Sequence, residues 1–302
     1  SKLSKQVNEI GCCIAAQNDS IAPADGLLYA IRDVTNTIDS IPLITASIIS
    51  KKAAEGLGSL VLDVKCGSAA FMKTQSDAEA LAKSMVGAAK GLGINAIAQI
   101  TKMDYPIGKY VGNSLEVIGS IEVLQGNGSS DTRDIVVIQG SSLLFQSGLV
   151  SNHHEAEKMI SGVIDDGQAL EFFKQMCISQ GVDKETAEAL IKNPGKVLKT
   201  AKNTTRVKSS KSGFVDSINS MTLAEIARKH GAGRFTIDDK IIPEIGFEIL
   251  IEHAQEITEG HDWLVFHHNE KLTEDDFFNL SNSLEIVSQK PKQTSRLISV
   301  IS

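Results

Sequence analysis

The chain has 302 residues, of which 42% are hydrophobic and 22% are charged, and its formal net charge is -7. This composition is typical of a globular protein and excludes the disordered and fibrous classes. Residues 41–50 form the longest apolar-rich run without a charge, which is too short for the roughly 20 residues of a membrane span. The negative charge argues against a nucleic-acid-binding surface, although a local cationic pocket could still hold a small anionic ligand.

The first predicted elements are a strand and two helices. Residues 11–17 are apolar and precede an Asn-Asp-Ser run, which predicts a strand followed by a turn. A helix is expected over residues 23–34, beginning at a Pro-Ala-Asp sequence. A second helix follows, with Asp39 or Ser40 as its N-cap, a proline in its first turn and Gly56 as its stop. Together the two helices form a predicted helical hairpin.

The next segment has the order strand, helix, strand. A β-rich apolar stretch over residues 59–65 is followed by a helical pattern over residues 76–92 and by a second apolar stretch over residues 94–100. This order predicts a right-handed parallel crossover in an α/β sheet. Residues 113–181 are mostly helical by their pattern, with stops at glycines.

The C-terminal third has a different pattern of predicted elements. Short predicted strands over residues 213–218, 247–252 and 263–267 surround one helix near residues 222–230, which indicates a small α+β lobe. The last dozen residues are rich in Ser, Lys and Gln, and we expect a surface strand or a tail there.

These elements predict an α/β protein with a mixed central sheet covered by helices, part of a small helical domain and a C-terminal α+β lobe. The predicted regions are residues 1–23 and 57–200 for the α/β domain, residues 24–56 for a helical hairpin with the binding residues, and residues 201–302 for the C-terminal lobe.

The four cysteines show no disulfide framework. Cys12 and Cys13 are adjacent and could bridge each other only with strain. We therefore expect reduced thiols and a cytoplasmic location. The chain opens with Ser-Lys-Leu-Ser, without a methionine or an apolar secretory core, so we expect no signal peptide and a start partway into a longer protein.

A polar stripe lies on the second predicted helix. Residues three and four positions apart share a helix face, so Ser40, Ile44, Ser47 and Lys51 form one stripe. The neighbouring positions are apolar, which predicts a helix buried nearly all round whose polar groups need partners. Arg32 on the preceding helix could reach the same pocket and offer a planar fork of donors.

These groups suit a flat ring in which two carbonyl groups flank an N–H. The hydroxyl can accept from the ring N–H, while the cations donate to the exocyclic oxygens and stabilise the negative charge that develops when the bond from ring to sugar breaks. In a plainer alternative, Arg32 pairs with Asp33 or Asp39, and Lys51 pairs with Glu55, as solvated ion pairs.

Several longer motifs carry a resemblance to a known family. They are YAIRDVT, DSIPLITASIISKK, LVLDVKCGSAAFMK, MDYPIGKYVGNSLEV, SSDTRDIVV, IDDGQALEFF and HGAGR. Together they closely resemble the thymidine phosphorylase and pyrimidine nucleoside phosphorylase family over nearly the whole chain. The stretches GCCIAAQ and PADGLLYA are most similar to the animal-type members.

The resemblance implies residue roles and a reaction. It implies that the pyrimidine base is held by Arg32, Ser47 and Lys51, with Arg32 and Lys51 catalytic, and that Tyr29, Ile38, Ile44 and Phe71 surround the base. The implied reaction is the reversible phosphorolysis of a pyrimidine deoxynucleoside by a pentosyltransferase. Phosphate is a co-substrate, no cofactor or metal is implied, and the family works as a homodimer without a nucleic-acid or membrane partner.

One departure from the family is large. The family binds phosphate with a glycine-rich loop that contains a Lys-His-Ser-Thr-Gly-Gly run, whereas this chain has no histidine before His153 and no such loop before Tyr29. We expect the chain to supply the pyrimidine-binding half of the site, with the phosphate loop on another segment or chain. The alternative is a noncatalytic pyrimidine-binding or dimer-interaction protein derived from the same scaffold.

Overall fold

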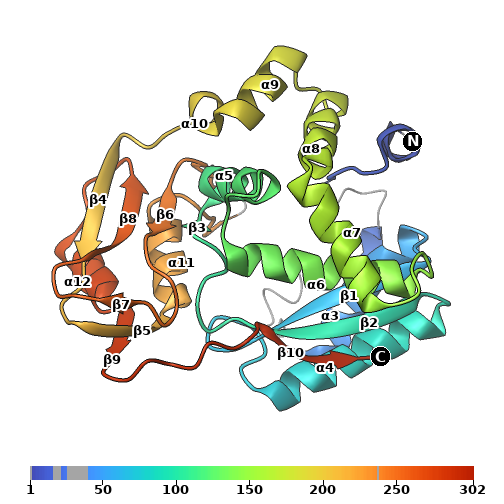
Figure 1. The fold of residues 1–302 in the computed structure, drawn as a ribbon, viewed down its shortest axis with the longest axis horizontal. Coiled ribbons are helices and arrows are strands. Elements are labelled where there is room, and N and C mark those ends of the chain that lie inside the picture. Colours follow the sequence, from blue (N-terminus) through green and yellow to red (C-terminus); the bar gives the residue numbers. More distant parts are fainter. Residues whose placement is uncertain (1, 16–21, 26–39, 237) are drawn as a thin grey trace. The chain divides into compact units, whose positions relative to one another are not determined.

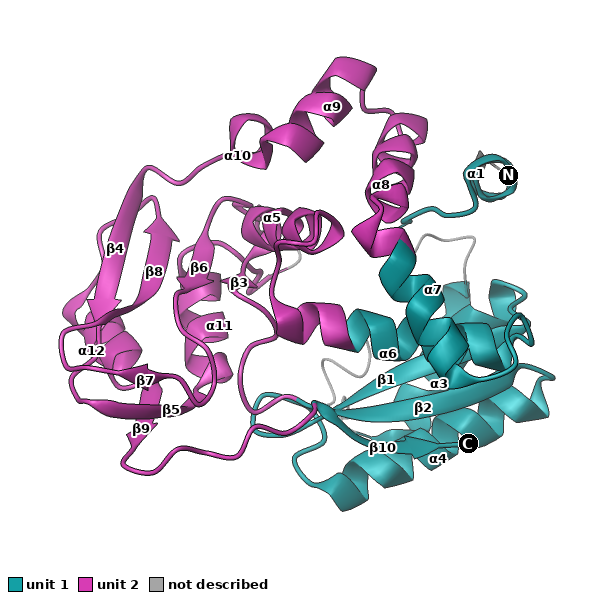
Figure 2. Cartoon of the chain, in the orientation of Figure 1, with its two compact units in different colours: residues 1–102, 135–162, 296–302 teal, residues 103–134, 163–295 magenta. Residues whose placement is uncertain are grey.

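The computed structural model describes residues 2–15, 22–25, 40–236 and 238–302. It is a mixed α/β structure, as predicted (Figure 1). Its contacts divide the chain into two compact units (Figure 2). Unit 1 is Ser1–Lys102, Ile135–Gly162 and Arg296–Ser302, and unit 2 is Met103–Asp134 and Val163–Ser295. These boundaries differ from those of the three predicted regions, because the chain leaves unit 1 and returns to it twice.

Unit 1 is built on a mixed three-stranded sheet. Strands β1 (Ser59–Cys66) and β2 (Asn95–Lys102) are parallel and are joined by helix α4 (Gln75–Gly91), so the predicted strand, helix, strand order is confirmed. Strand β10 (Leu297–Ile301) pairs antiparallel with β2 and completes the order β1-β2-β10. The last residues, for which a surface strand or a tail was expected, therefore form part of this sheet.

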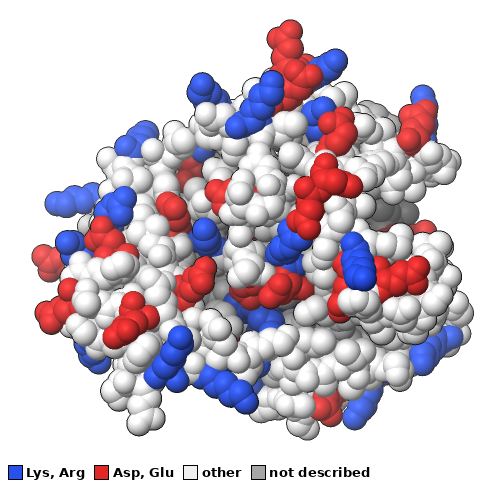
Figure 3. Space-filling view, in the orientation of Figure 1, with Lys and Arg blue, Asp and Glu red and all other residues white. Residues whose placement is uncertain are grey.

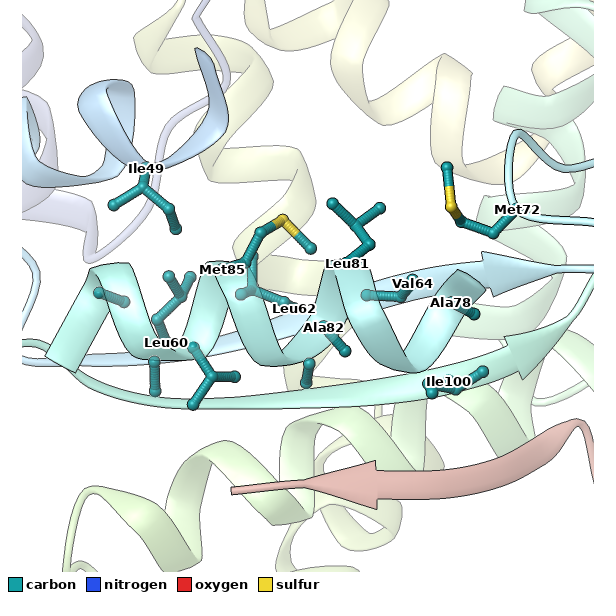
Figure 4. Close-up of a cluster of buried hydrophobic side chains, with 14 of the residues drawn as sticks. Ile49, Leu60, Leu62, Val64, Met72, Ala78, Leu81, Ala82, Met85 and Ile100 are labelled. Carbon is teal, nitrogen blue, oxygen red and sulfur yellow. The ribbon is translucent and has the colours of Figure 1, made fainter. Parts of the chain in front are cut away.

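The core of unit 1 lies between this sheet and the helices α3 (Ile41–Ala54) and α4. Alternate residues of β1 are buried, because successive side chains of a strand point to opposite faces of the sheet. Figure 4 shows side chains of β1 and α4 packed against one another, with Ile49 of α3 above them. The buried set includes Leu60, Leu62, Val64, Leu81, Ala82, Met85 and Ile100. Each large apolar side chain buried in this way contributes about 1.5–3 kcal/mol.

Helix α3 begins and ends where its sequence signals predict. Ser40 is the N-cap with an extended backbone, and Pro42 lies in the first turn, where its missing N–H costs nothing. After Glu55 at the C-cap, Gly56 adopts a positive φ of 71°, a conformation that glycine enters without the steric penalty of a Cβ. Thr45 and Ser47 are buried polar residues of this helix.

The central region is mostly helical, as predicted. Its helices are α5 (Asn113–Leu124), α6 (Ser130–Gln146), α7 (His153–Asp165), α8 (Gln168–Ser179), α9 (Lys184–Lys192) and α10 (Pro194–Val197), while α1 (Lys2–Ile10) lies at the N-terminus. Within unit 1, α6 contacts the sheet through polar side chains: the amide of Gln99 on β2 donates to Ser142 Oγ at 2.8 Å.

Unit 2 contains two antiparallel sheets. One has the order β3-β6-β8-β4 and consists of β3 (Tyr110–Val111), β6 (Gly246–Ile249), β8 (Asp262–His268) and β4 (Asn203–Lys208). The other has the order β7-β5-β9 and consists of β7 (Glu256–Ile257), β5 (Gly213–Ile218) and β9 (Leu284–Val287). Helices α11 (Ser220–Lys229) and α12 (Glu274–Ser281) accompany them, and Phe247, Trp263 and Phe266 lie fully buried in the core.

Two N-terminal predictions have different outcomes. Residues 23–25 are helical, in agreement with the predicted helix start, while residues 26–34 lie outside the described part of the chain. The strand predicted over residues 11–17 is wrong for residues 11–15, which form no strand. Ile14 is largely exposed there, so this apolar run is not buried as a core strand would be.

Acidic and basic side chains are interspersed on the face of the molecule drawn in Figure 3. None of the helices in the described residues is both long and apolar enough to span a membrane.

Candidate functional site

A pocket of about 290 Å³ lies in unit 1, at the carboxyl end of β1. Ligands of α/β proteins commonly bind at the carboxyl ends of parallel strands. Its lining contains three residues that the sequence predicts for base binding, namely Ile44, Ser47 and Phe71. The remaining lining residues are Ile48, Asp63, Val64, Lys65, Met72, Leu81 and Met85.

Most of the pocket wall is apolar. Helix α3 contributes Ile44 and Ile48, and helix α4 contributes Leu81 and Met85. Phe71 is 73% exposed, so most of its ring faces solvent. A small pocket with apolar walls and a few polar groups is the usual form of a site for a small organic molecule.

Phe71 is carried by a tight turn between β1 and α4. Gly67 has a φ of 140°, in the region that favours glycine. Its N–H donates to the carbonyl of Met72 at 3.0 Å, and the N–H of Ala70 donates to the carbonyl of Gly67 at 3.0 Å. These bonds leave Phe71 exposed at the pocket and bury Met72.

Ser47 connects the pocket with Lys51. The two residues are one turn apart on α3, and Lys51 Nζ donates to Ser47 Oγ at 3.0 Å. Ser47 is only 8% exposed. Lys51 does not line the pocket itself; its ammonium reaches the site through this hydroxyl, and its other bond is to the Asp25 carboxylate at 2.5 Å. The stripe predicted from residue spacing therefore unites a hydroxyl and a cation, as expected.

The partner that the plainer alternative gives to Lys51 is wrong, although Lys51 does form an ion pair, with Asp25. Glu55, its predicted partner, instead accepts from Lys52 Nζ at 2.8 Å in an exposed ion pair. The predicted site residues Tyr29, Arg32 and Ile38, with the possible partners Asp33 and Asp39, lie outside the described residues.

Asp63 and Lys65 also line the pocket, although they are not among the predicted site residues. Lys65 Nζ donates to Asp63 Oδ2 at 2.6 Å and to Thr101 Oγ1 at 3.0 Å. Asp63 also accepts from the Thr101 hydroxyl at 2.5 Å and from the Gln139 amide at 2.6 Å. Their position at the carboxyl end of a strand was the available signal.

A small, mostly apolar pocket at the carboxyl end of β1 is the arrangement in which α/β proteins commonly bind small ligands. The chain belongs to the glycosyl transferase family, a/b domain, whose family model matches residues 1–170. The resemblance carried by the sequence motifs is thereby confirmed at the level of the family.

Two mammalian relatives are thymidine phosphorylases. The protein of Rattus norvegicus is 41% identical over 265 residues, which cover 86% of this chain and 56% of the relative. The protein of Homo sapiens is 39% identical over 265 residues, covering 86% of this chain and 55% of the relative. The chain thus spans a little over half the length of these relatives.

A bacterial relative is the pyrimidine-nucleoside phosphorylase of Staphylococcus epidermidis. It is 38% identical over 285 residues, which cover 94% of this chain and 65% of the relative. The mammalian and the bacterial relatives are both named as phosphorylases, and the matches extend over both structural units.

Proposed function

We propose that this chain supplies the pyrimidine-binding half of a site for nucleoside phosphorolysis. The reaction is thymidine plus phosphate giving thymine and 2-deoxyribose 1-phosphate. The observation that carries the proposal is the pocket that contains Ile44, Ser47 and Phe71, with the Lys51 ammonium bonded to Ser47 Oγ. The names of the relatives support the same reaction.

The chemistry follows from where charge develops. A phosphate oxygen attacks C1′ of the sugar, the bond between C1′ and the base nitrogen breaks, and its electron pair moves into the pyrimidine ring. Negative charge then spreads onto the two exocyclic oxygens of the base. Cations held beside those oxygens stabilise the transition state more than the ground state, and one such donor commonly contributes about 3 kcal/mol.

In this proposal Arg32 and Lys51 are the catalytic cations, and Ser47 binds the imide edge of the base. Tyr29, Ile38, Ile44 and Phe71 surround the ring. The role of Ser47 is supported by its burial at the pocket and its bond with Lys51.

The proposal extends to the assembly of the enzyme. It requires phosphate as a co-substrate and no cofactor, with a phosphate-binding loop supplied by another segment or chain. We further propose a cytoplasmic homodimer, on the strength of the sequence resemblance.

The test compares two serines of α3 in the full-length protein. Ser47 is buried at the pocket, whereas Ser50 is exposed and donates to the Ser47 carbonyl at 3.2 Å. Ser47→Ala leaves a Lys51 donor and a ligand group without a partner, a loss of about 1–3 kcal/mol that weakens thymine binding by about 5- to 150-fold. Ser50→Ala should change the affinity for thymine by less than about 2-fold.

Thymine binding is measured by calorimetry, and turnover is measured as thymine released from thymidine with phosphate. Equal thymine affinity in the Ser47→Ala variant and the parent protein would remove Ser47 from the site. Thymine binding without thymidine cleavage, in a preparation that contains the phosphate loop, would establish the noncatalytic alternative.

A further inference from the structure

Lys51 is held by a carboxylate from a distant part of the sequence. Asp25 Oδ2 accepts from Lys51 Nζ at 2.5 Å, across 26 positions of the chain. The Asp25 side chain is 8% exposed and that of Lys51 is 25% exposed. Aspartate is rarely buried unless it is paired. This pair differs from the neighbouring Lys52–Glu55 pair, whose side chains are 34% and 39% exposed.

The hydrogen bonds of the ammonium have a defined direction. A lysine ammonium has three N–H donors and no acceptor. In the described residues two of these donors are used, one by Asp25 Oδ2 and one by Ser47 Oγ. Ser47 Oγ therefore accepts from Lys51, and the hydroxyl proton of Ser47 points elsewhere.

Among the described residues, the hydroxyl of Ser47 thereby keeps one donor and one acceptor site that a ligand could use. A serine hydroxyl has one donor and two acceptor sites, and Lys51 occupies one acceptor site. The remaining donor and acceptor lie on a side chain that lines the pocket. An imide edge, in which N–H and C=O groups are adjacent, requires both an acceptor and a donor.

We propose that Asp25 is a positioning residue for recognition of the base, acting through Lys51. This inference rests on the proposed function of the same pocket. The carboxylate anchors the end of a flexible four-carbon side chain, whose ammonium would otherwise sample many rotamers. The anchored ammonium then orients the Ser47 hydroxyl, the group through which it reaches the pocket.

The experiment is a double-mutant cycle on thymine binding in the full-length protein, measured by calorimetry. Asp25→Asn keeps the shape of the side chain but removes its charge, and loss of one charge-assisted bond should weaken thymine binding by about 10-fold or more. In the Lys51→Met background the same substitution should change the affinity by less than about 2-fold, because the ammonium through which Asp25 acts is absent.

Glu55→Gln is the matched control. It removes the carboxylate partner of Lys52, one residue further along the same helix. Because this pair is exposed, we expect thymine affinity within about 2-fold of the parent protein. Asp25→Glu, which keeps the charge, should bind thymine more tightly than Asp25→Asn.

Each outcome decides a separate claim. A parent protein that does not bind thymine refutes the proposed function. Equal thymine affinity in the parent protein and in the Asp25→Asn variant refutes only the role of Asp25. Equal losses in both backgrounds would show that Asp25 acts independently of Lys51. If Asp25→Asn alone fails to fold, the comparison of Lys51→Met with the double variant remains decisive, since a further loss there overturns the proposal.

Discussion

Asp63 should be important for the stability of unit 1, although its side chain is partly exposed. Its two oxygens accept from three groups on β1, β2 and α6, namely Lys65, Thr101 and Gln139. In Asp63→Asn one oxygen becomes an NH₂ group. If the remaining oxygen faces Lys65 and Gln139, the NH₂ group faces the buried Thr101 hydroxyl, whose proton then loses its acceptor.

The cost combines two terms. A buried hydroxyl proton without an acceptor costs about 1–3 kcal/mol, and the bond from Lys65 loses its charge assistance, which is worth about 1 kcal/mol. We therefore expect the free energy of unfolding of unit 1 to fall by about 2–4 kcal/mol. Glu79→Gln on α4 is the control, because its partner Lys83 is 65% exposed at 3.6 Å and the loss should stay below about 1 kcal/mol.

The assay must report on unit 1, and the single tryptophan does not, because Trp263 lies in unit 2. Hydrogen exchange read by mass spectrometry gives the opening free energy of β1 and β2, with β8 of unit 2 as an internal reference. Faster exchange confined to unit 1 is the expected result. A change no larger than that of Glu79→Gln would refute the hydrogen-bond accounting at Asp63.

Two further predictions concern unit 2, and both are followed by urea unfolding with Trp263 fluorescence. Burial of Asp276 opposes its ionisation, but hydrogen bonds from Lys229, Thr273 and His230 hold its pKa below the usual range; the resulting stabilisation is present above pH of about 4 and is lost as the pH falls. Asp276→Asn should therefore cost about 2–4 kcal/mol at pH 7 and progressively less in acid, whereas a deficit independent of pH would contradict this account. Gly112→Ala should cost more than about 2 kcal/mol, because a Cβ there would lie 2.4 Å from the Ile245 carbonyl at a φ of 125°. Gly126→Ala, at a φ of 78° with open space around it, should cost about 1 kcal/mol, and equal losses at the two glycines would refute the steric argument.

The elements that sequence predicts well are those whose signals are local. The helix α3 carries its own boundaries in Ser40, Pro42 and Gly56. Strands β1 and β2 are apolar runs joined by one amphipathic helix, so both their type and their parallel pairing follow from the pattern. Strands β3 and β7 have two residues each, too few for any periodicity to show.

In the candidate site, too, the local contacts are predictable from the sequence and the tertiary contacts are not. The proximity of Ser47 and Lys51 follows from helix geometry, since they are four residues apart. The partner of Lys51 cannot be read from helix geometry. Glu55 is the nearer acidic residue in the sequence, but tertiary packing brings Asp25 to Lys51. The strand prediction over residues 11–15 was wrong for a similar reason. An apolar run is compatible with a strand, but the tertiary context decides whether a strand forms.

Strand β10 links the order of folding to the order of synthesis. Arg296, just before it, bonds to the Lys102 carbonyl across 194 positions, and all of unit 2 lies between residues 102 and 296 of the chain. During translation β1, α4 and β2 emerge early, yet the edge of β2 that pairs with β10 in the described residues lacks that partner until β10 is made. Unit 2 can therefore complete its sheets first, while the nascent unit 1 exposes a strand edge that invites pairing with other chains.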